Sequence, residues 1–169
     1  MSVMVEFGVR QLRPSELPLF REHLLRLDAS SRRDRFNGPA GDAFLSAYAE
    51  RCFRDGTSVI GYLEYGRLLG AAEIHEFPGA EAPTGEIAFS VEHQAQHRGV
   101  GSALFARLIE IARLYGYSRL LVTTHPQNEA MKRLARRFDA RLSFAEGETV
   151  GTIELPPLES ELPRRLAMA

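Results

Sequence analysis

Apolar residues recur along the chain at two kinds of spacing, one typical of helices and the other of strands. Leu17, Phe20, Leu24 and Leu27 repeat at intervals of three and four residues and predict the buried face of a helix. The run 119–124 reads instead as one short apolar strand, which we expect to be buried and parallel. The pattern predicts strands over 5–12, 58–65, 68–77, 86–91, 119–124, 142–145 and 149–155, helices over 14–27, 42–54, 102–115 and 128–138, and a short polar turn or helix over 30–36.

Turn signals separate these elements. Asn37-Gly38-Pro39 should break the chain before a helix that Asp42 can cap. Hairpin turns are expected around 66–67 and 146–148. The order of elements gives a mixed sheet flanked by helices, in the α/β (α+β) class. We expect a single domain over 1–155 and a loose C-terminal tail over 156–169.

Composition narrows the possible functions. A chain of 169 residues that is 44% hydrophobic suits one domain with a full core. Its net charge of -1 gives no indication of the excess positive charge that nucleic-acid binding needs. We find no signal peptide and no long apolar run, so we expect a cytoplasmic protein with no membrane partner. Cys52 is the single cysteine and lies among apolar residues, which favours a core role over a nucleophilic one.

The stretch between the strand 86–91 and the helix 102–115 has the features of an anion site. It contains Gln96-His97-Arg98-Gly99-Val100-Gly101, a Gln-x-x-Gly-x-Gly pattern. The first N–H groups of a helix lack partners, and glycine lets the backbone approach a ligand closely. A P-loop would need Gly-Lys-Ser/Thr, and the dinucleotide fingerprint would need a glycine where Leu104 stands. We therefore expect a ligand with a phosphate or pyrophosphate group.

This loop and the order of elements resemble the GNAT acyltransferase superfamily. Residues 30–36 and 85–91 are most similar to the bacterial protein-acetyltransferase domain associated with acyl-CoA synthetases. The resemblance implies the GNAT fold, with a mixed, mostly antiparallel sheet of about seven strands flanked by four helices. It also implies an N-acetyltransferase that moves an acetyl group directly from acetyl-CoA to a primary amine, either a protein lysine or a small molecule. No metal is expected, and the protein should be a monomer or a homodimer.

The same resemblance assigns the cofactor-binding residues. The backbone of the fourth strand's end would pair with the pantetheine arm, the glycine loop would hold the pyrophosphate, and an asparagine would bind the arm. These residues are Phe89, Ser90 and Val91, then Gln96, His97, Arg98, Gly99, Val100, Gly101 and Ser102, and finally Asn128. Asn128 could equally be a helix N-cap, and the two roles are compatible.

Glu86 is the first candidate for the base that deprotonates the amine. A free Glu has a pKa of about 4.3 and a Lys amine about 10.4, so the Glu pKa must be raised or water must relay the proton. Glu73 and His75 are the runners-up, and their alternation with Ile74 puts them on one face of a strand. The tyrosine acid of the family falls on Ala135 here, so no tyrosine acid can be carried over.

Two other interpretations stay open. The protein could be a non-catalytic acyl-CoA-binding regulatory or sensor domain, since the tyrosine is missing and the spacing of Glu86 to the loop is one residue short. It could also transfer the acyl group to a hydroxyl or a thiol. His93 and His97 have a His-x-x-x-His spacing, but no glutamate follows the first histidine and no third ligand is in view, so we assign no metal.

Overall fold

The computed structural model describes residues 6–157. Residues 1–5, with the start of the first predicted strand, and 158–169, most of the predicted tail, lie outside the described part. Within residues 6–157, no helix combines the length and the apolar character needed to cross a membrane. The strands are β1 (Phe7–Gln11), β2 (Ser58–Glu64), β3 (Arg67–Phe77), β4 (Thr84–Val91), β5 (Arg119–Thr124), β6 (Arg141–Ala145) and β7 (Glu148–Glu154). The helices are α1 (Leu17–Arg26), α2 (Ala29–Phe36), α3 (Asp42–Arg54), α4 (Val100–Leu114) and α5 (Glu129–Arg137), with 3₁₀ turns at Pro14–Glu16 and His93–Ala95.

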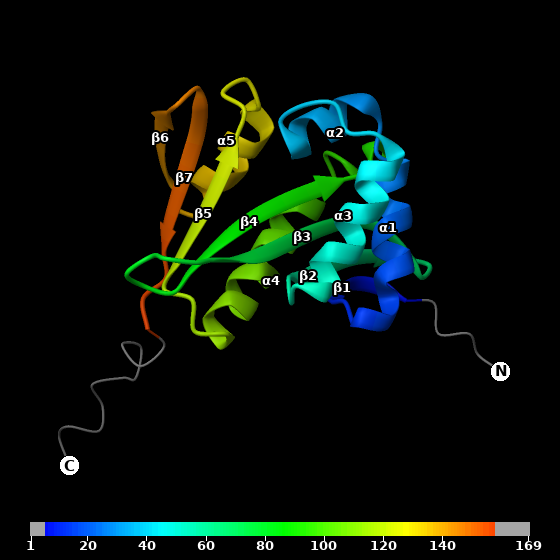
Figure 1. Cartoon of the computed structure of the whole chain (residues 1–169), viewed down its shortest axis with the longest axis horizontal. Coiled ribbons are helices and arrows are strands. Elements are labelled where there is room, and N and C mark those ends of the chain that lie inside the picture. Colours follow the sequence, from blue (N-terminus) through cyan, green and yellow to red (C-terminus); the bar gives the residue numbers. More distant parts are fainter. Residues whose placement is uncertain (1–5, 158–169) are drawn as a thin grey trace, which may run out of the picture.

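The strands form one seven-stranded sheet in the order β1-β2-β3-β4-β5-β7-β6 (Figure 1). All neighbours are antiparallel except β4 and β5, which run parallel. The predicted class, a mixed and mostly antiparallel sheet of about seven strands, is confirmed. The described part has five α-helices where four were expected, because Asp28 caps residues 29–36 by accepting a hydrogen bond from Ser31 N at 2.7 Å.

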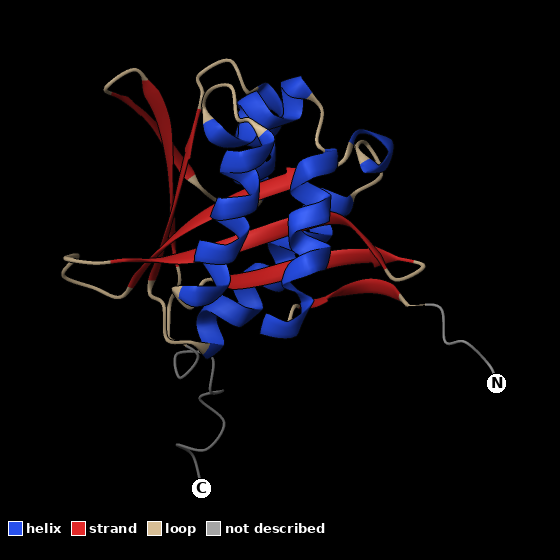
Figure 2. Cartoon of the chain, turned by 45° about the vertical axis from the view of Figure 1, so that its right-hand side comes forward, coloured by secondary structure: helices blue, strands red, loops and turns tan. Residues whose placement is uncertain are grey.

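Helices cover both faces of the sheet. α1 and α3 lie side by side across one face (Figure 2), and α4 packs on the other against β2, β3 and β4. Phe20, Leu24 and Leu45 are fully buried on the first side, and Leu104 and Phe105 are fully buried on the second. The predicted face is therefore confirmed at Phe20, Leu24 and the C-cap Leu27, whereas Leu17 at the start of α1 is only partly buried.

Some boundaries differ from the prediction for local reasons. Asp42 is not the cap of α3, because Gly41 occupies that position and the Asp42 carboxylate accepts a hydrogen bond from Arg32 at 2.8 Å. α4 begins at Val100, two residues early, because the left-handed Gly99 forms its N-cap. β5 has the predicted bounds, but it is not buried throughout, because successive side chains point to opposite faces of the sheet and only one face is well covered. It is parallel to β4 at three positions and antiparallel to β7 at six.

Candidate functional site: a cleft between diverging strands

β4 and β5 separate halfway along their length. Their parallel pairing ends at Glu86 and Leu121, although β4 continues to Val91 and β5 to Thr124. The rest of β4 pairs with β3 and the rest of β5 with β7, so the facing edges carry no strand partner. Figure 1 shows the two strands splaying apart, and a cleft of about 980 Å³ lies at this divergence. A ligand placed there could take up the unused backbone groups of β4.

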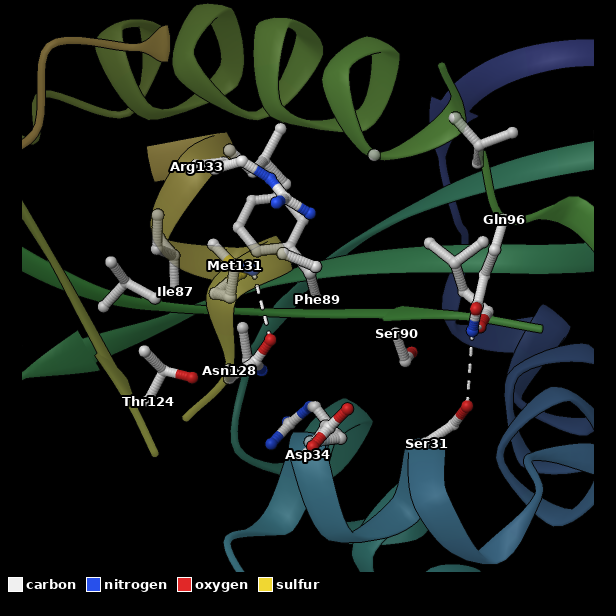
Figure 3. Close-up of a pocket in the computed structure, with 18 of the residues that line it drawn as sticks. Ser31, Asp34, Ile87, Phe89, Ser90, Gln96, Thr124, Asn128, Met131 and Arg133 are labelled. Atoms are coloured by element: carbon white, nitrogen blue, oxygen red, sulfur yellow. Dashed lines mark hydrogen bonds between the residues drawn. The ribbon is translucent and has the colours of Figure 1, made fainter. Parts of the chain in front are cut away.

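Two helices form the opposite walls of the cleft. In Figure 3, α2 contributes Ser31 and Asp34 from one side, and α5 contributes Asn128, Met131 and Arg133 from the other. A stack of aromatic rings supports the floor: Phe89 lies 4.7 Å from Phe105, which lies 4.4 Å from Phe138 between ring centroids. These stacked rings connect β4, α4 and the C-cap of α5.

The glycine loop closes one end of the cleft at the start of α4. His97 and Gly99 are both left-handed, with φ of 59° and 79°. This conformation favours glycine and turns the chain sharply into the helix. The N–H groups of the first turn of α4 have no partner within the helix, and Gln96, His97, Gly99, Val100, Gly101 and Ser102 all line the cleft. The arrangement is suited to binding an anion.

Two polar side chains of the loop have structural partners. The Gln96 amide donates to the Val91 carbonyl at 3.0 Å and to Ser31 Oγ at 3.3 Å, so it ties the loop to β4 and α2. Arg98 pairs with Glu64 on β2 and is not among the residues that line the cleft. Only the backbone of Arg98 can therefore belong to the binding loop.

Polar groups of β5 and α5 also reach the cleft. Asn128 caps α5, since its Oδ1 accepts from Met131 N at 3.1 Å, and its side-chain NH₂ donates to no described residue. The cap role that the sequence allowed is thus present, and the NH₂ is still available to a ligand. Thr124 is 5% exposed, and its hydroxyl has no hydrogen-bond partner among the described residues. Such buried hydroxyls are costly unless a ligand or water satisfies them.

The candidate base Glu86 lies at the vertex where the strands separate. It is exposed, lines the cleft, and is paired with His75 on β3 and Leu121 on β5. Asp34 and Glu148 also line the cleft, and Glu148 accepts a hydrogen bond from Asn37 at 2.8 Å. Carboxylates on three different elements therefore line the cleft.

The two alternative candidates for the base, Glu73 and His75, do not line the cleft. Glu73 and His75 share a face of β3, as predicted, and His75 Nε2 lies 3.0 Å from Glu73 Oε1. Glu73 is fully buried, and both its oxygens accept from Arg35 at 2.9 Å. Burial alone would raise the pKa of Glu73, but the charge of Arg35 and hydrogen bonds from His75 and Tyr48 lower it to about 2. The carboxylate is thus held as a permanent anion inside an ion pair, unsuited to accepting a proton near neutral pH.

Cys52, Glu73 and His75 form the one group of described residues with ligand atoms close enough for a metal ion, within 4.8 Å of one another. The Glu73 carboxylate already forms an ion pair with Arg35. Burial and the charge of Glu73 raise the pKa of the Cys52 thiol to about 12. The Glu73 carboxylate would have to give up its ion pair with Arg35 to bind a metal, so the chemistry of this set does not favour one.

A second buried polar group was not anticipated from the sequence. His23 of α1 contacts Ser90 Oγ through Nε2 and Glu92 through Nδ1, and Arg26 pairs with Glu92 at 2.9 Å. His23 follows Phe20 by three residues on the apolar face of α1, and a histidine at such a position was the available signal. Burial raises the pKa of Glu92, but hydrogen bonds from His23 and Arg26 lower it to about 2.

The lowered pKa values of the buried carboxyls Glu73 and Glu92 predict loss of stability in acid. An unfolded Glu titrates near a pKa of about 4.3, so each native carboxylate stabilises the fold fully above about pH 5. That stabilisation, about 2–3 kcal/mol for each group, should disappear as pH falls from about 5 towards 2. Urea midpoints measured at pH 7, 4 and 2.5 should fall steadily. Equal midpoints at pH 7 and pH 2.5 would contradict the ionised state of Glu73 and Glu92.

The fold that carries the divergent strands, the glycine loop and the cleft is similar to the fold of solved acetyltransferase structures. Three solved structures show it. The GNAT domain of S. lividans PAT has a TM-score of 0.74 at 20% identity, with 87% of this chain and 89% of that one covered. An N-acetyltransferase from Staphylococcus aureus Mu50 has a TM-score of 0.71 at 20% identity (89% and 99% covered). A phosphinothricin acetyltransferase from Sinorhizobium meliloti, in complex with AcCoA, has a TM-score of 0.64 at 18% identity (93% and 96% covered).

The family follows from the sequence itself. The model of the acetyltransferase (GNAT) family matches residues 22–140, which is more than half of the chain. The protein belongs to the GNAT family of acetyltransferases, as its loop sequence indicated. The structural similarities at 20% identity or below show the fold alone, so the resemblance to the synthetase-associated subfamily stays a prediction.

Proposed function

We propose that the cleft binds acetyl-CoA and transfers its acetyl group directly to a primary amine. The main observation in support is the unpaired edge of β4, which runs from the anion site at α4 to the carboxylate of Glu86. From Glu86 to Val91 the strand rises five residues, roughly 17 Å. A ligand with phosphates on α4 can place a thioester between Ser90 and Glu86 only through a long extended arm, and the pantetheine of CoA is such an arm.

The proposed contacts follow the cleft from one end to the other. The N–H groups of the glycine loop, from residues 97 to 102, would bind the pyrophosphate. The backbone of Phe89, Ser90 and Val91 and the free NH₂ of Asn128 would bind the pantetheine amides. Arg133 and Arg137 of α5 also line the cleft, and Arg137 donates to Ser102 Oγ at 3.2 Å. Their charge would complement the CoA phosphates.

We propose that the acceptor enters at the Glu86 end as a cation. Asp34, Glu86 and Glu148 line the cleft and give it negative charge, whereas the charge of Arg35 is neutralised by Glu73. Glu86 is the proposed base, acting directly or through water. The gap of about 6 pKa units from an ordinary Glu to a Lys amine corresponds to about 8 kcal/mol whether the proton moves directly or through water, so the proton must pass on from the site to solvent.

Glu86→Gln should lower kcat by about a hundredfold near neutral pH, because it removes the proposed proton acceptor and keeps the shape of the side chain. The affinity for acetyl-CoA should change little, since Glu86 is at the far end of the cleft from the anion site. Steady-state rates from pH 6 to 9, with calorimetric titration of acetyl-CoA, check this. A variant with full activity over the whole range would place the base elsewhere.

A protein lysine is slightly favoured over a small molecule as the acceptor. The preference depends on the resemblance of residues 30–36 and 85–91 to protein acetyltransferase domains. Incubation of a cell lysate with labelled acetyl-CoA and the protein separates the two. Discrete labelled protein bands that weaken with Glu86→Gln support a lysine acceptor, whereas label confined to small molecules contradicts it.

A CoA-binding sensor that transfers nothing is the second candidate. It is favoured by Ala135, which stands where the family's tyrosine acid would be and is 1% exposed inside the core. That position of α5 can therefore supply no proton to the leaving thiolate. A thiol of pKa about 8.5 still leaves tolerably as thiolate, which keeps transfer the leading proposal.

A further inference from the structure

A hydroxyl, an imidazole and a carboxylate lie in series on the wall of the cleft. Ser90 Oγ is 2.8 Å from His23 Nε2, and His23 Nδ1 is 2.9 Å from Glu92 Oε2. Ser90 lines the cleft, on the opposite side of β4 from Phe89 (Figure 3). The imidazole of His23 is fully buried, so this series meets the cleft at Ser90. A nucleophile hydrogen-bonded to a base that a third group orients is the arrangement used in nucleophilic acyl transfer.

The partners of His23 set which of its nitrogens can accept a proton. Because the Glu92 carboxylate accepts from Nδ1–H, the lone pair of the neutral ring is on Nε2, which faces the Ser90 hydroxyl. Glu92 is held in place by Arg26, which also donates to the Leu68 carbonyl at 2.7 Å. Among the described residues, Glu92 and Arg26 are the charged groups in contact with His23 or with its carboxylate partner.

We propose that Ser90 is a nucleophile that takes the acetyl group from acetyl-CoA when no amine occupies the cleft. This activity depends on the proposed binding of acetyl-CoA, but it differs from transfer to an amine. It would give the protein a covalent acetyl-serine form and, after hydrolysis, a slow thioesterase activity. Ser90 would be the catalytic residue, His23 would move the proton, and Glu92 would be a positioning residue.

The bonds and protons of the reaction balance without another reactant. Ser90 Oγ forms a bond to the thioester carbonyl carbon while its proton passes to His23 Nε2. The C–S bond then breaks, the sulfur keeps the electron pair, and His23 returns the proton to give free CoA thiol and acetyl-Ser90. In the second half, water attacks the ester through the same histidine and releases acetate and Ser90. The sum is acetyl-CoA plus water giving CoA and acetic acid.

The cleft offers a matched control for this chemistry. Ser31 also lines the cleft with a hydroxyl, but its Oγ accepts from the Gln96 amide and contacts no imidazole among the described residues. A hydroxyl that lacks a neighbouring base stays protonated and is a weak nucleophile. Acetylation directed by His23 should therefore occur at Ser90 and not at Ser31.

The test is to incubate the purified full chain with acetyl-CoA and no amine, quench with acid, and locate acetyl groups by peptide mass spectrometry. Wild type should carry one acetyl group on Ser90 and none on Ser31, and should release CoA without an acceptor. Ser90→Ala should carry none, and His23→Gln should acetylate at least about a hundredfold more slowly. Glu92→Gln should also acetylate Ser90 slowly, and this variant provides the test if His23→Gln does not fold.

The controls separate this proposal from the proposed function. Calorimetry must first show that wild type binds acetyl-CoA, and circular dichroism must show folded variants. A wild-type protein that binds acetyl-CoA and acetylates amines but never carries acetyl-Ser90 overturns the nucleophile and keeps the proposed function. Equal labelling in wild type, His23→Gln and Glu92→Gln, or label on Cys52, also overturns it. Absence of acetyl-CoA binding overturns both proposals.

Discussion

Arg35→Ala should cost about 3–5 kcal/mol of unfolding free energy, because it leaves the fully buried Glu73 carboxylate without its counter-charge. Arg35 also lies over the Phe36 ring at 4.4 Å from its centroid, so the variant loses this contact as well. Since Arg35 joins α2 to β3, the wall of the cleft should loosen together with the fold. Urea unfolding at pH 7, followed by circular dichroism, measures the change.

The chain supplies a matched exposed pair as the control. Arg119 Nε lies 2.9 Å from Glu154, the same distance as Arg35 from Glu73, but the two side chains are 44% and 50% exposed. Arg119→Ala should therefore cost less than about 1 kcal/mol. A double variant, Arg35→Met with Glu73→Gln, should recover part of the loss because no charge stays buried. If Arg35→Ala costs no more than Arg119→Ala, Glu73 does not depend on Arg35 for its charge compensation.

Gly99→Ala should raise the dissociation constant for acetyl-CoA at least about tenfold, the equivalent of about 1.4 kcal/mol. Gly99 has a φ of 79°, a conformation that costs an L-residue about 1–2 kcal/mol, so the loop should shift away from its binding geometry. No described atom lies within 4 Å of the added Cβ, so core packing is not disturbed. Isothermal calorimetry with acetyl-CoA checks the result.

Gly116→Ala is the control for backbone strain. It has a φ of 83°, follows the other end of α4, and has equally open space around its Cβ. The two variants should lose similar stability, but only Gly99→Ala should lose affinity. Gly101 is less suitable, because a Cβ there would lie 3.3 Å from Leu134 Cδ2 and would disturb the packing of α4 on α5. If the two variants bind acetyl-CoA with equal affinity, the glycine loop is not the anion site.

The sequence predicted those elements whose signals are local. β5 was predicted with its bounds, and α5 begins directly after the predicted cap Asn128. The glycine loop was recognisable because left-handed backbone and a helix start both depend on adjacent residues. The helical state of α2 stayed ambiguous, since its eight residues carry almost no apolar periodicity and its stability comes from the Asp28 cap and the pairing of Arg35.

The buried polar contacts were not predictable in the same way. Glu73 and Arg35 are 38 residues apart, and Glu92 and His23 are 69 apart, so no local pattern relates their charges. Asp42 shows the same limit at shorter range, because its carboxylate pairs with Arg32 instead of capping α3. The divergence of β4 from β5, which creates the cleft, depends on strand pairing that only the folded chain reveals.

The most direct test of the central claim is the release of CoA thiol from acetyl-CoA by the wild-type protein, with and without a panel of primary amines and lysine peptides. The proposed function predicts that at least one amine accelerates the release many-fold and appears as its N-acetyl product in equal amount. Gly99→Ala should need more acetyl-CoA to reach the same rate, because the loop would hold the cofactor less tightly. A wild-type protein that binds acetyl-CoA, yet releases CoA no faster with any amine, would contradict the claim and favour the sensor.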